Sequence, residues 1–233
     1  MTAQAPPLFQ LAVFDVAGTT VFDGDAVLEC LRDALSAHVS ASLQDVREVM
    51  GLPKPVAIRQ VLRMHRDGDA SPHVVEAVHD DFRAALIARY RDDTAITPVP
   101  GAAEVFDALR SAGVTVALDT GFSRDILDAL LTRLGWIDGV AINFSVTSDE
   151  VPRGRPYPDL IYRAMQLAGV RAPWSVIKVG DTPFDLLEGL AANCGLVVGV
   201  TYGTHSRAEL ERPKVVTIDS LSALLPLAGL GAA

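Results

Sequence analysis

Residues 11–20 read Leu11-Ala12-Val13-Phe14-Asp15-Val16-Ala17-Gly18-Thr19-Thr20. The stretch opens as a short apolar run, which predicts a strand buried on both faces. It then reaches an acid followed by a Gly-Thr-Thr segment, a composition that stops a strand and begins a loop. We therefore expect Asp15 at the carboxyl end of a buried strand, the edge at which open α/β sheets bind ligands. The alternative is an aspartate that only caps the following turn.

The composition is that of a soluble, folded protein. The 233 residues leave room for one large domain or for a core with a smaller second domain, and 49% of them are hydrophobic. A net charge of −9 without any basic run argues against a nucleic-acid surface. The sequence shows no leader-like start and no apolar stretch of membrane-spanning length, so we expect no membrane partner. Two distant cysteines, Cys30 and Cys194, fit a reducing cytoplasm.

Residues 23–95 show helical patterns and no convincing strand. Within them, Val78, Phe82 and Leu86 recur at four-residue spacing, which indicates one apolar helix face. Several helices in a row exceed what one crossover between parallel strands requires. We therefore interpret 23–95 as an inserted helical module.

The remaining chain, 1–22 and 96–233, alternates strands with helices. After the first apolar run, strands are expected at 114–120, 140–146, 175–179, 196–200 and 215–218. This alternation predicts an α/β fold with a doubly wound parallel sheet, a Rossmann-like core.

Chemically active groups follow four of the expected strands. They are Asp15, then Thr120 with Gly121, then Arg153 and Arg155, and finally Asp181 with Asp185. All of them are expected at the same edge of the sheet. Carboxylate oxygens together with a substrate phosphate suit Mg²⁺, and a carboxylate can also attack phosphorus. The set therefore predicts phosphoryl-group chemistry, in which positioning and charge neutralisation do most of the work.

In order and spacing, these motifs resemble the haloacid dehalogenase (HAD) superfamily of hydrolases. The resemblance covers nearly the whole chain and implies that 23–95 is a helical cap inserted into the core. It implies that Asp15 is the catalytic nucleophile and that Arg155 holds both this nucleophile and the phosphate. Thr120, Gly121 and Gly51 are implied to bind the substrate.

The same resemblance implies a cofactor and partners. One Mg²⁺ is expected, with Asp15, the main-chain carbonyl of Ala17, Asp181 and Asp185 as its metal-binding residues. The expected partner is a small organophosphorus substrate, and a homodimer formed through the cap is a further implication.

Position 17 separates this chain from most phosphatases of the superfamily. They carry there a second aspartate that protonates the leaving oxygen, a contribution commonly worth about 10²–10⁴-fold. Ala17 instead resembles the phosphonatase branch, the phosphonoacetaldehyde hydrolases. Their cap motif Met-Gly-Leu-x-Lys supplies a lysine that forms a Schiff base, and this chain reads Met50-Gly51-Leu52-Pro53-Lys54. An iminium on Lys54 would accept the electron pair released when a P–C bond breaks.

The match to phosphonatases is not complete, and alternatives remain open. Ala57, Phe122 and Asp25 stand where those enzymes have His, Tyr and Cys. Lys54 is either a Schiff-base residue, a cation that reads the substrate, or a surface lysine. The competing functions are a capped phosphomonoesterase, a dehalogenase in which Asp15 attacks carbon, and a binding module with an inactive site.

Overall fold

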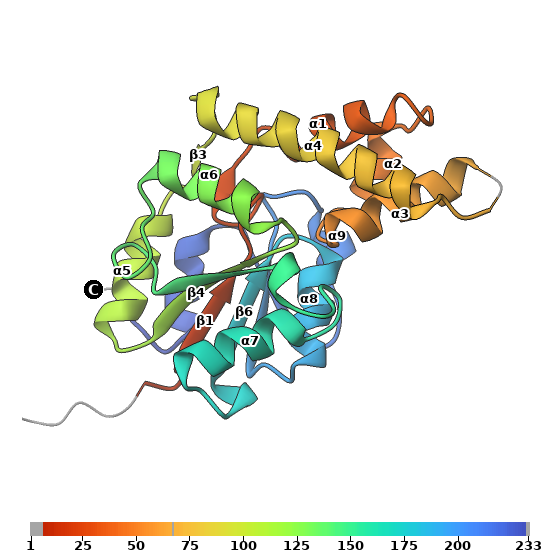
Figure 1. The fold of residues 1–233 in the computed structure, drawn as a ribbon. Helices are drawn as coiled ribbons and strands as arrows, with labels where there is room; N and C mark the ends of the chain where they lie inside the picture. Colours follow the sequence, from red (N-terminus) through yellow and green to blue (C-terminus); the bar gives the residue numbers. More distant parts are fainter. Residues whose placement is uncertain (1–6, 67, 232–233) are drawn as a thin grey trace, which may run out of the picture.

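The computed structural model describes residues 7–66 and 68–231. Among these residues the main sheet has six parallel strands in the order β5-β4-β1-β6-β7-β8 (Figure 1). The strands are β1 (Leu11–Phe14), β4 (Thr115–Thr120), β5 (Phe144–Thr147), β6 (Val176–Gly180), β7 (Leu196–Val200) and β8 (Val215–Ile218). The prediction of a doubly wound parallel α/β sheet is confirmed.

All four residues of the central strand β1 are buried. Because side chains alternate between the two faces of a strand, both faces of the sheet must be covered at this point. Leu11 and Val13 pack with α7, whereas Ala12 and Phe14 belong to the larger core that includes α5. Helices α7 (Asp159–Ala168) and α8 (Pro183–Ala191) thus lie on one face, and α5 (Ala102–Ser111) with α10 (Leu224–Leu227) on the other. Helices α6 (Arg124–Leu134) and α9 (Arg207–Leu210) complete the α-helices around the sheet. Short 3₁₀ helices lie at Ser148–Glu150, Pro173–Ser175 and Leu221–Ala223.

A segment of four helices lies between two short strands, β2 (Val21–Phe22) and β3 (Thr97–Pro98), which pair antiparallel. The helices are α1 (Ala26–Leu35), α2 (Leu43–Arg47), α3 (Lys54–His65) and α4 (Pro72–Asp92). They pack on one another, and α4 also packs on α6 (Figure 1). We call residues 26–92 the helical segment; its status as a separate cap domain remains a prediction.

One strand begins later than the sequence pattern indicates. We expected a strand over 140–146, but β5 starts at Phe144. Gly139 has a φ of +79° and Val140 is 64% exposed, so the first apolar residues belong to a surface turn. Within the described residues, none of the helices combines the length and the apolar character needed to cross a bilayer.

Candidate active site

The carboxyl ends of the parallel strands bring most of the predicted site residues around one cavity of about 20 Å³. It is lined by Asp15, Ala17, Met50, Gly51, Lys54, Thr120, Gly121, Phe122, Arg155 and Thr182. Strand β1 lies between β4 and β6, and the strand order of the sheet reverses at this point. The cavity therefore lies at the place where open α/β sheets commonly bind ligands. A cavity of this size has room for about one water molecule. The helical segment therefore covers the site closely.

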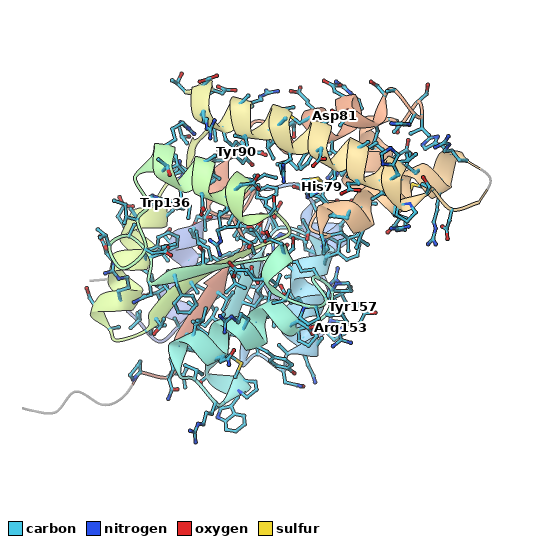
Figure 2. The ribbon with its side chains drawn as sticks, in the orientation of Figure 1. His79, Asp81, Tyr90, Trp136, Arg153 and Tyr157 are labelled. Atoms are coloured by element: carbon cyan, nitrogen blue, oxygen red, sulfur yellow. The ribbon has the colours of Figure 1, made fainter. Side chains whose placement is uncertain are left out.

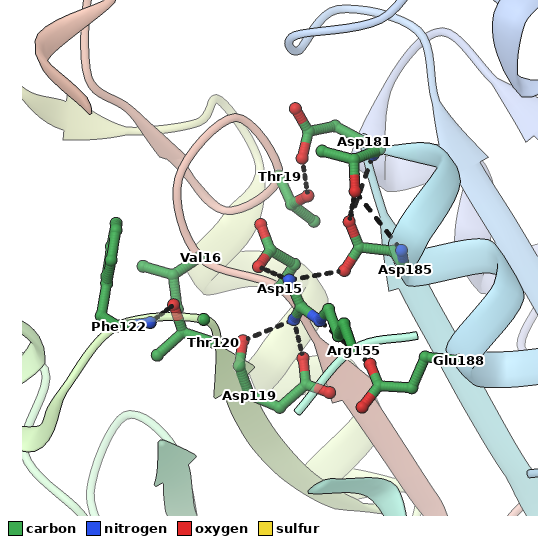
Figure 3. Close-up of polar contacts among 12 residues, drawn as sticks. Asp15, Val16, Thr19, Asp119, Thr120, Phe122, Arg155, Asp181, Asp185 and Glu188 are labelled. Atoms are coloured by element: carbon green, nitrogen blue, oxygen red, sulfur yellow. Dashed lines mark hydrogen bonds and ion pairs between the residues drawn. The ribbon is translucent and has the colours of Figure 1, made fainter. Parts of the chain in front are cut away.

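Arg155 is the electrostatic centre of the site (Figure 3). Its Nη1 donates to Asp15 Oδ1 at 2.7 Å and lies 2.9 Å from Asp185 Oδ1. Its Nη2 donates to the main-chain oxygen of Asp119 at 3.0 Å and to the carboxylate of that residue at 2.5 Å. Its Nε donates to Glu188 Oε2 at 3.0 Å. All three guanidinium nitrogens thus have acceptors, and Arg155 contacts Asp15 as expected, while the catalytic roles of both residues remain a prediction.

Three buried charges in this cluster were not predicted as site residues: Asp119, Lys178 and Glu188. Lys178 Nζ contacts the carboxylate of Asp119 and lies 3.1 Å from Glu188 Oε2. The attraction of Arg155 and Lys178 outweighs the burial that raises the pKa of Asp119, and the net effect lowers that pKa. A charged residue inside an otherwise apolar strand, such as Lys178 in β6, is the sequence signal that could have pointed to them.

Acids outnumber cations in this buried cluster. The acids are Asp15, Asp119, Asp181, Asp185 and Glu188, and the cations beside them are Arg155 and Lys178. Burial and the neighbouring Asp185 raise the pKa of Asp15 to about 8, although Arg155 opposes the shift. Burial and Asp185 likewise raise the pKa of Asp181 to about 6. Carboxyl groups in such an arrangement fit a further cation, because a positive charge favours their ionised form.

The acids form two sets with respect to such a cation. Oxygens of Asp15, Asp119 and Asp185 lie within 4.8 Å of one another and could hold a metal ion. However, Arg155 already contacts all three of these carboxylates. The ligand set expected from the sequence, Asp15, the Ala17 carbonyl, Asp181 and Asp185, supplies the hard oxygen atoms that Mg²⁺ prefers, and the roles of these residues as ligands stay a prediction.

Hydrogen bonds from nearby threonines hold the carboxylates of Asp181 and Asp185, the two acids that follow β6. Asp181 Oδ1 accepts from Thr19 Oγ1 at 3.1 Å, and Oδ2 accepts from the Thr204 main-chain N–H at 2.7 Å. Gly18 is required beside it, because a Cβ there would lie 2.3 Å from Asp181 Oδ2. Asp185 belongs to the capping box of α8, in which Thr182 Oγ1 donates to its Oδ2 at 2.6 Å.

Lys54 begins α3 and reaches the cavity from the helical segment. It is only 3% exposed, and burial lowers its pKa to about 8 although Asp15 opposes the shift. Its Nζ lies over the face of the Phe122 ring, 5.2 Å from the centroid. The interpretation of Lys54 as a surface lysine is therefore wrong, because the structure buries it beside Asp15.

The turn that immediately precedes Lys54, Gly51–Pro53, lies close to three loops at the carboxyl edge of the sheet. A Cβ on Gly51 would lie 2.3 Å from Thr182 Oγ1, and one on Gly121 would lie 2.6 Å from the Leu52 carbonyl oxygen. A Cβ on Gly154 would lie 2.3 Å from Pro53 Cγ. These approaches are possible only because the three positions are glycine.

A second cavity, of about 550 Å³, lies outside this turn and is lined by Leu52 and Pro53. Arg153 lies there and does not enter the inner cavity. Its guanidinium lies over the ring of Tyr157, 4.5 Å from the centroid (Figure 2). It also pairs with Asp159 at 3.0 Å.

The chain matches the family of haloacid dehalogenase-like hydrolases over residues 9–193. A phosphonoacetaldehyde hydrolase of Bacillus cereus is 32% identical over 227 residues, which cover 91% of this chain and 83% of that protein. Other similar relatives, from strains of Bacillus cereus and Bacillus thuringiensis, carry the same name at 31% identity.

Solved structures share the fold at lower identity. A phosphonoacetaldehyde hydrolase-like protein from Oleispira antarctica has a TM-score of 0.81 at 21% identity and covers 98% of this chain and 95% of its own. A predicted phosphoglycolate phosphatase from Haemophilus somnus has a TM-score of 0.76 at 21% identity, with 94% and 98% covered. At this identity the two likenesses concern the fold alone.

Proposed function

The chain belongs to the haloacid dehalogenase-like hydrolases, in their phosphonatase-like branch, and we propose that it cleaves the P–C bond of a small aldehyde-bearing phosphonate. Phosphonoacetaldehyde is the first candidate, and Mg²⁺ the proposed cofactor. The proposal rests above all on one observation: Lys54 and Asp15 line the same small, buried cavity. Once the turn over this cavity opens to admit a short substrate, an amine and a carboxylate would both be within the same site to react with it.

The first chemical role belongs to Lys54. Because burial lowers its pKa to about 8, a useful fraction of the amine is neutral near neutral pH and can attack a carbonyl carbon. The resulting iminium draws electrons from the P–C bond. The position of Lys54 at the first residue of α3, after Pro53, gives the amine a stiff base for this attack.

The second role belongs to Asp15, which attacks phosphorus. Arg155 orients its carboxylate and offers a positive charge to the phosphoryl oxygens. Thr120 and Gly121 line the same cavity, and the Thr120 hydroxyl and the Gly121 main-chain N–H would bind those oxygens. A bound Mg²⁺ would neutralise charge on the phosphonate and on Asp15, with Asp181 and the Ala17 carbonyl as the proposed ligands beside it.

Ala17 supports P–C over P–O cleavage. Departure of an alkoxide benefits from an acid at this position, whereas departure of an enamine carbon does not require a proton on oxygen. The alternative is a capped phosphomonoesterase in which Lys54 reads a negative charge on the substrate. Ala57, which replaces the histidine of the phosphonatases, favours that alternative because it removes a proton-transfer group near Lys54.

Product analysis separates the two functions. The purified protein with Mg²⁺ is incubated with phosphonoacetaldehyde and, in parallel, with a panel of phosphate monoesters. Equal amounts of acetaldehyde and inorganic phosphate from the phosphonate, with slow turnover of the esters, would support the proposal. Rapid hydrolysis of ordinary sugar phosphates without acetaldehyde release would instead support the phosphatase.

A further inference from the structure

Phe122 presents an aromatic face to the atom on which the proposed chemistry takes place. Lys54 Nζ lies 5.2 Å from the ring centroid, within the distance at which a cation is attracted by the ring quadrupole. Both side chains are only 3% exposed, so water does not screen the contact. From the sequence alone, Phe122 is only a residue that replaces the tyrosine of the phosphonatases.

The ring is held in place from several directions. The Phe122 main-chain N–H donates to Thr120 Oγ1 at 3.2 Å, and its carbonyl accepts from the Ser148 main-chain N–H at 3.0 Å. Tyr90, on α4, is fully buried and meets the ring edge-on, with centroids 6.1 Å apart and planes at 68°. A ring fixed in this way can act on charge without first reorganising.

We infer that the face of Phe122 stabilises the positive charge on Lys54 Nζ in the iminium and thereby favours covalent capture of the aldehyde. The inference rests on the proposed Schiff-base function and assigns Phe122 a direct part in it. The ring hydrogen-bonds to nothing, so a tyrosine at this position would keep the effect and a leucine would lose it.

The charge on nitrogen changes in a defined order. The Lys54 lone pair forms a C–N bond to the carbonyl carbon, and the carbonyl electron pair moves to oxygen, which takes up one proton from solvent. Loss of water from this adduct gives C=N⁺, with the positive charge on Nζ. When Asp15 forms an O–P bond and the P–C bond breaks, the released pair moves through carbon to nitrogen and leaves a neutral enamine. The ring therefore favours formation of the iminium and not the cleavage that follows.

Fluorinated phenylalanines at position 122 test this without changing shape, because each added fluorine weakens the negative face of the ring. The readout is the initial rate at which borohydride traps phosphonoacetaldehyde on Lys54, measured by mass spectrometry of the peptide. We expect a stepwise fall along the mono-, di- and trifluorinated series. The full loss should be about 30-fold, the equivalent of ~2 kcal/mol for a desolvated cation–π contact.

The effect should also depend on pH in a way that packing does not. Well above pH 8 the amine is neutral and gains the ring interaction only as an iminium, so fluorination should slow trapping fully. Well below pH 8 the ammonium already has the same interaction, and the difference should shrink. Asp15, Arg155, Asp23 and Asp181 also act on the charge of Lys54, but fluorination leaves them unchanged.

Two substitutions serve as controls, together with the thermal unfolding temperature of each protein. Phe122→Tyr keeps the aromatic face and should lose much less of the trapping rate than Phe122→Leu, which should lose about as much as the fully fluorinated ring. Trapping at the parent rate throughout the fluorinated series would overturn the inference while leaving the Schiff-base function intact. If the parent itself forms no adduct on Lys54, the proposed function fails, and this inference fails with it.

Discussion

Substitution Gly121→Ala should prevent the Gly51–Pro53 turn from closing over the cavity. The new Cβ would lie 2.6 Å from the carbonyl oxygen of Leu52 and 3.1 Å from its carbonyl carbon. Both contacting atoms belong to the main chain, so no flexible side chain can move aside. Reaching an ordinary contact of 3.4 Å requires the turn to retreat by about 0.8 Å, the difference between the two distances.

This retreat should cost far more activity than stability. Lys54 follows the turn directly, so its amine would move away from a substrate held by Asp15 and Arg155. A misplacement of about 1 Å in reacting groups costs on the order of 10²-fold in rate. We therefore expect kcat/KM for phosphonoacetaldehyde to fall about 100-fold, with only a small change in the thermal unfolding temperature, because Gly121 lies in a loop.

Phosphate release under steady-state conditions measures the loss, and Gly231→Ala is the matched control. A Cβ at Gly231 meets nothing within 4 Å, so this variant should keep the parent's activity and stability. Gly154→Ala should act like Gly121→Ala, since its Cβ would lie 2.3 Å from Pro53 Cγ on the same turn. If Gly121→Ala turned over substrate as fast as the parent, close approach of this turn would play no part in catalysis.

Four further predictions concern the chemistry. Asp15→Asn should abolish phosphate release without lowering the unfolding temperature, because burial and Asp185 already disfavour the charge that the substitution removes; measurable turnover would rule out Asp15 as nucleophile. Lys54→Arg keeps the charge but cannot form an imine, so acetaldehyde release should cease, and retained activity would mean that Lys54 only reads the substrate. The rate of imine formation should rise with pH and level off above about 8, because burial lowers the pKa of Lys54 and only the neutral amine attacks; a rate that fell over this range would contradict the assignment. Ala17→Asp should raise activity toward phosphate monoesters by up to about 10²-fold through general acid catalysis, and assays against esters of graded leaving-group pKa would detect it.

The sequence predicts the sheet because the signals for it are local. Apolar runs ending in Asp15 and Asp181 mark two neighbouring strands, and turn residues mark where they stop. Converging strand ends then place Asp15, Thr120, Arg155 and Asp181 at one edge without any knowledge of packing. The late start of β5 shows the limit, because an apolar residue such as Val140 can lie on a surface turn.

The pairing of the buried charges could not be predicted in this way. Whether Lys178 meets Asp119 depends on the register of β6 and β4 on either side of β1, and on the side chain of Glu188 reaching in from α8. Likewise, the need for glycine at positions 121 and 154 is visible only in the folded structure, where the Gly51–Pro53 turn packs against both. Contacts between segments far apart in the chain leave no periodic signal in either segment.

Burial of the site has opposite consequences for the two proposed nucleophiles. It raises the pKa of Asp15 to about 8 and lowers that of Lys54 to about 8, since each shift disfavours the charged form. The neutral form of lysine is the reactive one, whereas the neutral form of aspartate is unreactive. Closure of the helical segment therefore activates Lys54 by itself but leaves Asp15 dependent on added positive charge. Arg155 supplies one such charge and already shares it among Asp15, Asp119, Asp185 and Glu188. The excess of acids thus gives a physical reason for a divalent cation at this site, independent of any resemblance to other proteins.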